Sequence, residues 1–238
     1  MSGKTKKHQV AIYVTDNDDL TNITDLIRIA KSTANTISAN PTTNSYDYID
    51  AEKPETELDS YSYSMDHDIA AYKGNDDYEW AFEKFFYGDT GDDAKGVVVC
   101  VFMDHENPAG TYKAFASKAT FSVSDADWVT GAVNINIAFN GDPVFGAVTS
   151  SSGTPVFTQA PDKPSIACSA NSVTMACDTS GATIKYTDDG TDPTTSSTAQ
   201  TYSEAITITE DTTFKAAAVS TTDNVYSRVV KLNAEYSA

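Results

Sequence analysis

The sequence predicts an all-β fold with one helix, in which a larger β-rich domain is followed by a small Ig-like β-sandwich domain. Short segments alternate apolar and polar residues with the period of two that is typical of half-buried strands. One segment, 76–87, has helical periodicity instead. From Thr149 the composition shifts to Ser, Thr, Gly and Pro. We therefore expect domains at 1–150 and 164–238, joined by a linker at 151–163.

Composition and charge restrict the function. The 238 residues hold 16 Lys and Arg against 34 Asp and Glu, a net charge of −18, so a protein that grips nucleic acid phosphates is disfavoured. The apolar run from Val10 to Val14 is too short for a signal peptide, and no membrane span is expected. The three cysteines match no zinc spacing and are expected to be reduced, although Cys168 and Cys177 could face each other across a hairpin.

The N-terminal segment is expected to form a basic arm followed by a long-looped hairpin. Residues 1–8 carry three lysines and no apolar residue beyond Met1. A short strand follows at 9–15. A second alternating strand at 27–33 runs up to a long acidic loop at about 39–58, and the chain returns through a strand at 61–69. The lysines of the arm are Lys4, Lys6 and Lys7.

The long loop is predicted to be exposed, because acids outnumber bases and Pro54 interrupts it. Since arm and loop have opposite charge and neither can form a core, we expect each to order on a neighbouring subunit. The alternative is that these side chains pack on their own subunit and the charges are solvated. The candidate inter-subunit residues of the loop are Tyr46, Asp47, Tyr48, Ile49, Asp50, Glu52, Glu55 and Glu57.

The strand at 61–69 predicts two distinct faces. Met65 and His67 share the apolar face, whereas Asp66 and Asp68 share the polar one. Neighbouring strand residues point to opposite faces, so His67 cannot join the two carboxylates in a metal site, and we expect no metal there.

The helix at 76–87 has recognisable start and stop signals: Asn75 can cap its N-terminus and Gly88 can close its C-terminus. We interpret its apolar stripe as packing on a sheet. The predicted stripe is Tyr78, Ala81, Phe82 and Phe85.

Further strands are expected at 97–103 and 112–124, the latter with a break near Ser117, and in the segment 128–150. Beyond the linker, short strands follow at roughly ten-residue spacing, which is typical of an Ig-like sandwich.

Three motifs within residues 46–148 resemble the major tail tube proteins of long-tailed (siphovirus-type) bacteriophages. They are YDYIDAEKPETELDSY, then DHDIAAYKGNDDYEWAFEKFF, and a closing FNGDPVFGAV. The resemblance implies a β-sandwich subunit with one flanking helix, which forms hexameric rings that stack into the virion's tail tube. Implied partners are other copies of the chain, the tape measure protein and tail terminator or tip proteins. DNA would pass through the lumen without specific binding, past Asp66 and Asp68 as candidate lumen-facing acids, after assembly in the host cytoplasm.

The C-terminal segment resembles the Ig-like domain at the C-terminus of chitobiase and β-hexosaminidase-type enzymes. The motifs are GATIKYTDDGTDPTT, AITITEDTTFKAAAV and VVKLNAEY. In tail proteins such a domain would decorate the outer surface, with host glycans as a further candidate partner of residues 164–238. A carbohydrate-binding or adhesive module is accordingly the alternative function.

No catalytic residue, metal ligand or cofactor site is predicted. No Ser or Cys motif resembling a nucleophile elbow accompanies His8, His67 or His105. The acidic segment TDDGTDPT at 187–194 lacks the length and terminal glutamate of a calcium-binding loop and is read as a turn. The sequence therefore favours a structural protein over an enzyme.

Overall fold

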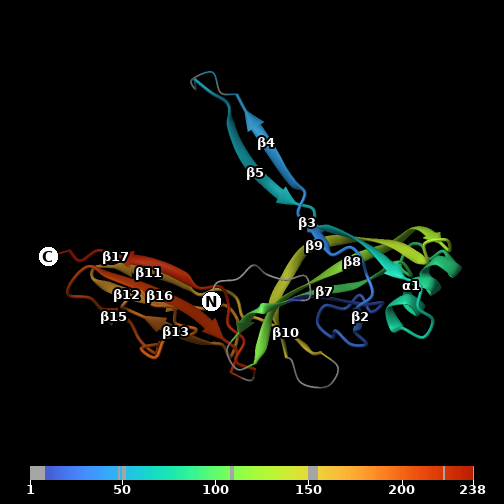
Figure 1. The fold of residues 1–238 in the computed structure, drawn as a ribbon. Coiled ribbons are helices and arrows are strands. Elements are labelled where there is room, and N and C mark those ends of the chain that lie inside the picture. Colours follow the sequence, from blue (N-terminus) through green and yellow to red (C-terminus); the bar gives the residue numbers. More distant parts are fainter. Residues whose placement is uncertain are drawn as a thin grey trace. The chain divides into compact units, whose positions relative to one another are not determined.

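The computed structural model describes residues 9–47, 49, 52–107, 110–149, 155–221 and 223–237 (Figure 1). These residues form one helix and 17 strands, which confirms the predicted fold class. Two compact units result: one comprises the described residues up to Cys100 together with 116–143, and the other comprises 101–115 together with 144–238. Residues 101–115 and 144–149 thus group with the Ig-like region, whereas the sequence predicted one boundary at residue 150.

The first unit is built on one sheet with the strand order β2-β1-β7-β8-β9-β6-β3. Its strands are β1 (Val10–Thr15), β2 (Ile27–Ile29), β3 (Thr36–Ser38), β6 (Ser64–Ala70), β7 (Lys95–Asn107), β8 (Thr111–Asp127) and β9 (Ala132–Thr149).

This sheet curls until its two edges approach each other. β2 and β3 are consecutive in the chain yet lie at opposite ends of the strand order. The segment between them contacts both edges, because Ser32 bridges to Ile69 of β6 and the Asn35 side chain donates to the Val10 carbonyl of β1 (3.4 Å). Val97 to Cys100 of β7 are completely buried, as expected for a strand covered on both faces.

The acidic segment expected to be a loop is a β-hairpin instead. Strands β4 (Pro41–Tyr46) and β5 (Glu55–Tyr61) pair with each other, and all their residues are exposed as predicted. The expected strand 61–69 is therefore divided at residues 62–63, where Asn40 donates to the Ser62 carbonyl (2.8 Å). Threonines in both strands favour extended backbone, which the charge count did not reveal.

The helix α1 (Asp76–Tyr87) has the predicted bounds. Gly88 ends it in the left-handed conformation, and its N–H donates to the Lys84 carbonyl (3.1 Å). Asn75 occupies the N-cap position, but its side chain makes no capping bond. Glu79 instead accepts from the Gly74 N–H (2.7 Å), so the predicted cap was wrong in its chemistry.

Long strands replace two predicted interruptions. β7 continues to Asn107 through residues expected to be a turn, and β8 has no break at Ser117. The alternation of buried and exposed residues shifts by one residue at this point, because the adjacent Ala116 and Ser117 are both buried.

In the second unit, the expected linker contains a strand. β10 (Phe157–Gln159) pairs with β9 from Val148 to Gly146. A Cβ at Gly146 would collide with the Thr158 carbonyl, so glycine permits this close pairing.

The Ig-like region consists of two small sheets around one core, as predicted. One sheet contains β11 (Ser165–Ser169), β12 (Ser172–Ala176) and β15 (Ile206–Thr207). The other contains β14 (Gln200–Thr201), β13 (Thr183–Thr187), β16 (Thr212–Val219) and β17 (Val230–Ala234). Phe214 and Tyr186 lie in the shared core. Cys168 pairs with Val173 while Ser165 pairs with Ala176, so Cys168 and Cys177 are out of register and both are free thiols.

Candidate assembly surfaces

The β4–β5 hairpin has one acidic face. Cross-strand partners lie on the same face of a two-stranded ribbon, and the register pairs Tyr46 with Glu55 and Asn44 with Glu57. The next pairs, Ser45 with Thr56 and Thr43 with Leu58, belong to the opposite face, and none of these four side chains is charged. We name the surface of Tyr46, Asn44, Glu55 and Glu57 the acidic hairpin face.

The structure places most of the predicted loop residues on this hairpin or near its tip. Tyr46, Asp47, Ile49, Glu52, Glu55 and Glu57 are exposed. Tyr48, Asp50 and the arm residues Lys4, Lys6 and Lys7 lie outside the described residues. An isolated two-stranded hairpin is marginally stable in water, so the exposure of both faces indicates a segment that gains stability from a partner.

The candidate lumen residues lie on the predicted polar face of the sheet. Asp66 is opposite Asn136, which donates to its Oδ1 (2.8 Å), and Asp68 is opposite Asn134. Thr33 donates to Asp68 Oδ2 (3.3 Å). This face of β6 and β9 is therefore an ordered array of carboxylates and amides, while the other face belongs to the core.

His67 lies in that core beneath the polar face, as the alternation predicts. It is 1% exposed, and its Nδ1 is 3.0 Å from the Ala34 carbonyl, which can only accept. Nδ1 therefore carries the proton in the neutral ring, and the buried Nε2 has no partner within the described residues. Burial lowers the pKa of His67, although the Ala34 hydrogen bond opposes the shift.

The buried face of α1 differs from the predicted stripe. Asp77, Trp80, Ala81 and Lys84 are buried, whereas Phe85 is exposed. The sequence pattern failed because two of the buried residues are charged and pair within the subunit. Periodicity assigns such residues to the solvent side.

Lys84 anchors the helix through three oxygen partners. Its Nζ lies 3.1 Å from Asp16, 2.9 Å from Asp89 and 2.9 Å from the Asp93 carbonyl. Burial lowers the pKa of Lys84, but the hydrogen bonds to Asp89 and Asp16 outweigh it and raise the pKa above its usual value. Trp80 donates to the same Asp16 carboxylate (2.9 Å), which fixes the ring in the core.

With this face turned inward, α1 leaves Phe85, Phe86 and Tyr87 exposed and Phe82 half-buried. Trp128, from the turn after β8, packs edge-on against Phe82 and Phe85 at ring-centroid distances of 6.3 and 6.1 Å. Phe86 stacks on Phe82 (5.8 Å) and contacts Tyr87 (5.2 Å). We name these side chains the aromatic surface. An exposed apolar cluster of this kind marks an interaction site.

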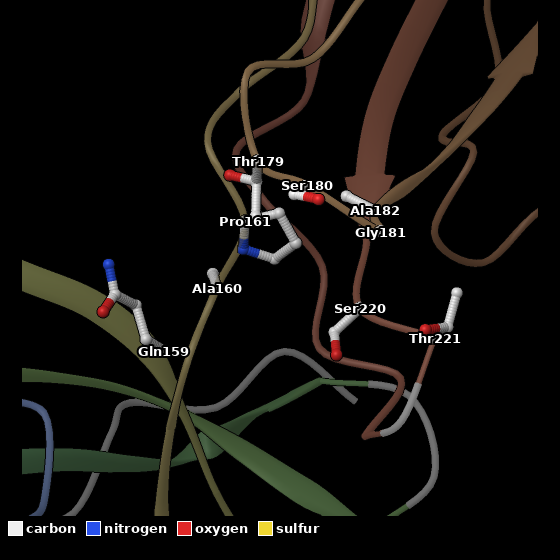
Figure 2. A pocket seen from close by; sticks show the side chains of 9 residues that line it. All are labelled: Gln159, Ala160, Pro161, Thr179, Ser180, Gly181, Ala182, Ser220 and Thr221. Atoms are coloured by element: carbon white, nitrogen blue, oxygen red, sulfur yellow. The ribbon is translucent and has the colours of Figure 1, made fainter.

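The second unit contains an open pocket of about 390 Å³ lined by small side chains (Figure 2). It lies among residues 159–161, the turn 179–182 and residues 220–221, and no titratable side chain lines it. In the described part of the chain, no three His, Cys, Asp or Glu side chains are grouped to hold a metal ion. No helix among the described residues is long and apolar enough to cross a membrane.

The acidic segment 187–194 forms a turn as predicted. Asp189 accepts hydrogen bonds from the N–H and hydroxyl of Thr191 (2.9 and 2.6 Å) and from the Thr198 hydroxyl (2.7 Å). These bonds lower the pKa of Asp189 to about 2. The carboxylate thus organises the turn internally.

Few aromatic side chains are available for a sugar platform in the Ig-like region. Tyr186 and Phe214 are buried, Tyr202 and Tyr226 are half-buried, and Tyr236 is exposed.

The chain was compared with known protein families, curated proteins and solved structures. Residues 165–231 match the model of the chitobiase/beta-hexosaminidase C-terminal domain. No curated protein matches the chain. A chain of the cryo-EM structure of the anti-feeding prophage (AFP) baseplate, 6-fold symmetrised, aligns over 61% of this chain and 97% of that chain, with a TM-score of 0.38 and 10% identity. A likeness this weak carries no argument about function.

Proposed function

We propose that the chain is a structural subunit of a bacteriophage tail tube, in which hexameric rings stack around a channel for DNA. The observation that carries the proposal is the β4–β5 hairpin, whose two strands are exposed on both faces. Such a ribbon needs a partner for stability, and a subunit repeated in a ring and a stack supplies one. Resemblance of the hairpin sequence to tail tube proteins supports the same assignment.

The polar face of β6 and β9 fits the wall of a DNA channel. Asp66 and Asp68 are held by neighbouring side chains, and β6 contains no Lys or Arg. Carboxylates repel a polyanion near the wall, over a Debye length of about 8 Å at physiological salt. Amides such as Asn136 add no positive charge to this surface.

The proposal includes a division of labour between tube and decoration. The Ig-like region has its own core, so it can fold beside the tube and project from it. The proposed function assigns no catalytic role to any residue.

A carbohydrate-binding or adhesive module is the second candidate, favoured by the match of residues 165–231 to a domain named after sugar hydrolases. In this case the isolated protein would remain monomeric and bind glycans. Within the described part of the Ig-like region, Tyr236 is the exposed aromatic side chain that could stack on a sugar ring.

The test is electron microscopy of the purified protein across a concentration series, together with a glycan-binding screen of the same sample. We expect six-fold rings or tubes and no glycan binding. A hairpin-deleted variant, in which residues 41–61 are replaced by a short Gly-Ser linker, should remain a folded monomer. A monomeric wild type that binds glycans would establish the second candidate and refute the first.

A further inference from the structure

The aromatic surface is a contiguous apolar area of the first unit. Phe82 and Phe86 lie one helical turn apart and stack on each other, and Trp128 packs against Phe82 and Phe85 from the β8–β9 turn. Phe86 is 66% exposed and Trp128 is 55% exposed. The neighbouring Val129 is exposed as well. Exposed rings in mutual contact are typical of the central part of a protein interface, where aromatic residues are enriched.

α1 places acids along one side of these rings. Glu79 lies three residues before Phe82, and Glu83 lies three residues before Phe86. Side chains at this spacing are neighbours on the surface of a helix. Asp76 lies two helical turns before Glu83 on the same side. Asp76, Glu79 and Glu83 are exposed, and none of them forms an ion pair in the part of the chain that the structure describes.

The β8–β9 turn places a further acid beside the rings, next to Trp128. Asp127 precedes Trp128, and its Oδ1 accepts hydrogen bonds from the N–H groups of Val129 and Thr130 (2.7 and 3.3 Å). The backbone hydrogen bond from Val129 is the main cause that lowers the pKa of Asp127, so this carboxylate is charged near neutral pH. The rings therefore have carboxylates beside them on the helix and in the turn, which is the arrangement of an apolar interface centre with a polar rim.

We propose that the aromatic surface binds a basic amphipathic helix of a different protein. The apolar side chains of that helix pack on Phe82, Phe86 and Trp128. Its Lys or Arg side chains lie against Glu83 and Asp127. Charge complementarity selects this partner, because carboxylates border the rings. The inference goes beyond the proposed function and does not depend on it, since a tube subunit and a monomer have the same α1.

The shape of the aromatic surface favours a helix as the partner. Phe82 and Phe86 are four residues apart and form a ridge along α1, and Phe85 with Trp128 forms a second apolar row beside it. Two helices pack by placing such ridges into each other's grooves. An amphipathic helix presents its apolar side chains at the same intervals of three and four residues.

This chain is a poor match for its own aromatic surface. Its net charge is −18, so a second copy brings predominantly acids toward Glu79 and Glu83, and like charges across an interface are unfavourable. Residues 1–8 carry three lysines, but their one apolar residue is Met1. That segment offers charge for the carboxylates and too little apolar area for the rings. A different protein with a basic amphipathic helix offers both.

A model peptide tests the proposal on the full chain. The probe is a synthetic helix of about 18 residues with leucine on one face and lysine on the other. Two comparison peptides replace every lysine by glutamine or by glutamate. In isothermal titration calorimetry we expect the lysine peptide to bind at least 10-fold more tightly than either comparison peptide, with a negative heat-capacity change because apolar area is buried. Equal affinity for the three peptides, or no binding of the lysine peptide, would overturn the proposal.

A matched pair of variants locates the apolar contact. Phe86→Ser should weaken binding of the lysine peptide at least 10-fold, whereas Phe145→Ser in the second unit should leave it within about 2-fold of wild type, although both side chains are 66% exposed. Circular dichroism of each variant checks folding. Equal affinities in the two variants would mean that the peptide binds elsewhere and that the proposal is wrong.

A second matched pair tests the charges. Asp76→Asn with Glu83→Gln removes two carboxylates beside the rings and should weaken binding about 5-fold at low salt, since exposed ion pairs are individually weak. Glu204→Gln with Glu210→Gln removes two exposed carboxylates from the Ig-like region and should change the affinity less than about 2-fold. An equal loss in the two double variants would show that the peptide responds only to the net charge of the chain, against the proposal.

Two further measurements test the occupants that belong to this chain. If a chain lacking residues 1–8 binds the lysine peptide at least 10-fold more tightly than the full chain, the N-terminal segment occupies the surface. If the lysine peptide blocks self-assembly of wild type, a second copy occupies it. Either result overturns the inference. The tube assignment depends on electron microscopy of the protein without peptide, so the failure of one proposal is distinguishable from the failure of the other.

Discussion

Asp77 of α1 accepts a hydrogen bond from the Lys31 backbone N–H, 2.8 Å away, and so binds the helix to the point where the chain leaves β2. The same Oδ2 accepts from the Ala30 N–H (2.9 Å). A buried carboxylate with two backbone donors in a distant segment is a tertiary anchor as well as a helix-terminal acid. It connects the edge of the sheet to the helix that carries the aromatic surface.

Asp77→Ala should therefore lower the free energy of unfolding by about 2–4 kcal/mol, because two N–H groups lose their acceptor. Asp76→Ala removes an exposed acid from the same turn and should change it by less than about 0.5 kcal/mol. Urea denaturation followed by tryptophan fluorescence measures both. Equal losses in the two variants would mean that Asp77 acts only through the helix dipole.

His67 should make the stability of the first unit depend on pH. Its pKa is lowered in the folded state, so the unfolded chain binds the proton first as pH falls below about 6.5. Stability is thus present above that pH and declines below it, down to the folded-state pKa, with a slope of at most about 1.4 kcal/mol per pH unit. Protonation would place an N–H at the unpartnered Nε2.

His67→Gln does not titrate, so the pH dependence of its unfolding free energy should be flatter than that of wild type between pH 7 and 5. His105→Gln serves as the control because its side chain is 61% exposed, and it should retain the wild-type slope. Denaturant titrations at half-unit pH steps give the comparison. An identical slope in wild type and His67→Gln would assign the pH dependence to carboxylates.

The sequence predicted what depends on local periodicity and missed what depends on pairing between distant segments. The α1 bounds and the two faces of β6 followed from residue spacing and from Gly88. The buried face of α1 did not, because Asp77 and Lys84 are polar and find their partners 46 residues upstream and up to 68 residues away. The hairpin was predicted to be a loop because its strands lack the alternation of apolar and polar residues that identifies a half-buried strand. The aromatic surface was not predicted, because aromatic residues at helical spacing usually belong to the core.

Strand β10 makes the behaviour of truncated chains depend on where the cut lies. A chain ending at Pro161 keeps the pairing of Phe157 with Val148, and we expect it to be soluble and to assemble without the Ig-like region. A chain ending at Ser150 exposes the edge of β9 and should aggregate or assemble poorly. Size-exclusion chromatography and electron microscopy distinguish the two, and a Pro161 chain that cannot assemble would show that the Ig-like region is needed for the tube.

Gly146→Ala in the full chain tests the same pairing without a cut. A Cβ there meets the Thr158 carbonyl and lies 2.8 Å from Phe157 Cζ, so β10 should separate from β9. Hydrogen exchange at Ala160, whose N–H donates to the Phe145 carbonyl (2.9 Å), should become at least 10-fold faster. Unchanged exchange would mean that the strands adjust to the added methyl group.

The acidic wall of the proposed channel gives the last prediction. Asp66→Lys with Asp68→Lys places cations on the polar face of β6, where phosphates would be attracted rather than repelled. The Asn136 hydrogen bond to Asp66 is lost, but the side chains on this face lie outside the core, so tubes of normal length should still form. We expect DNA ejection from virions carrying this variant to slow at least 10-fold at physiological salt and to recover as salt is raised, because screening shortens the range of the attraction.

Asp66→Asn with Asp68→Asn is the control variant: it removes the repulsion without adding attraction and should have a smaller effect. Ejection kinetics followed by DNA-dye fluorescence measure all three, and wild-type rates in the lysine variant would place Asp66 and Asp68 outside the lumen.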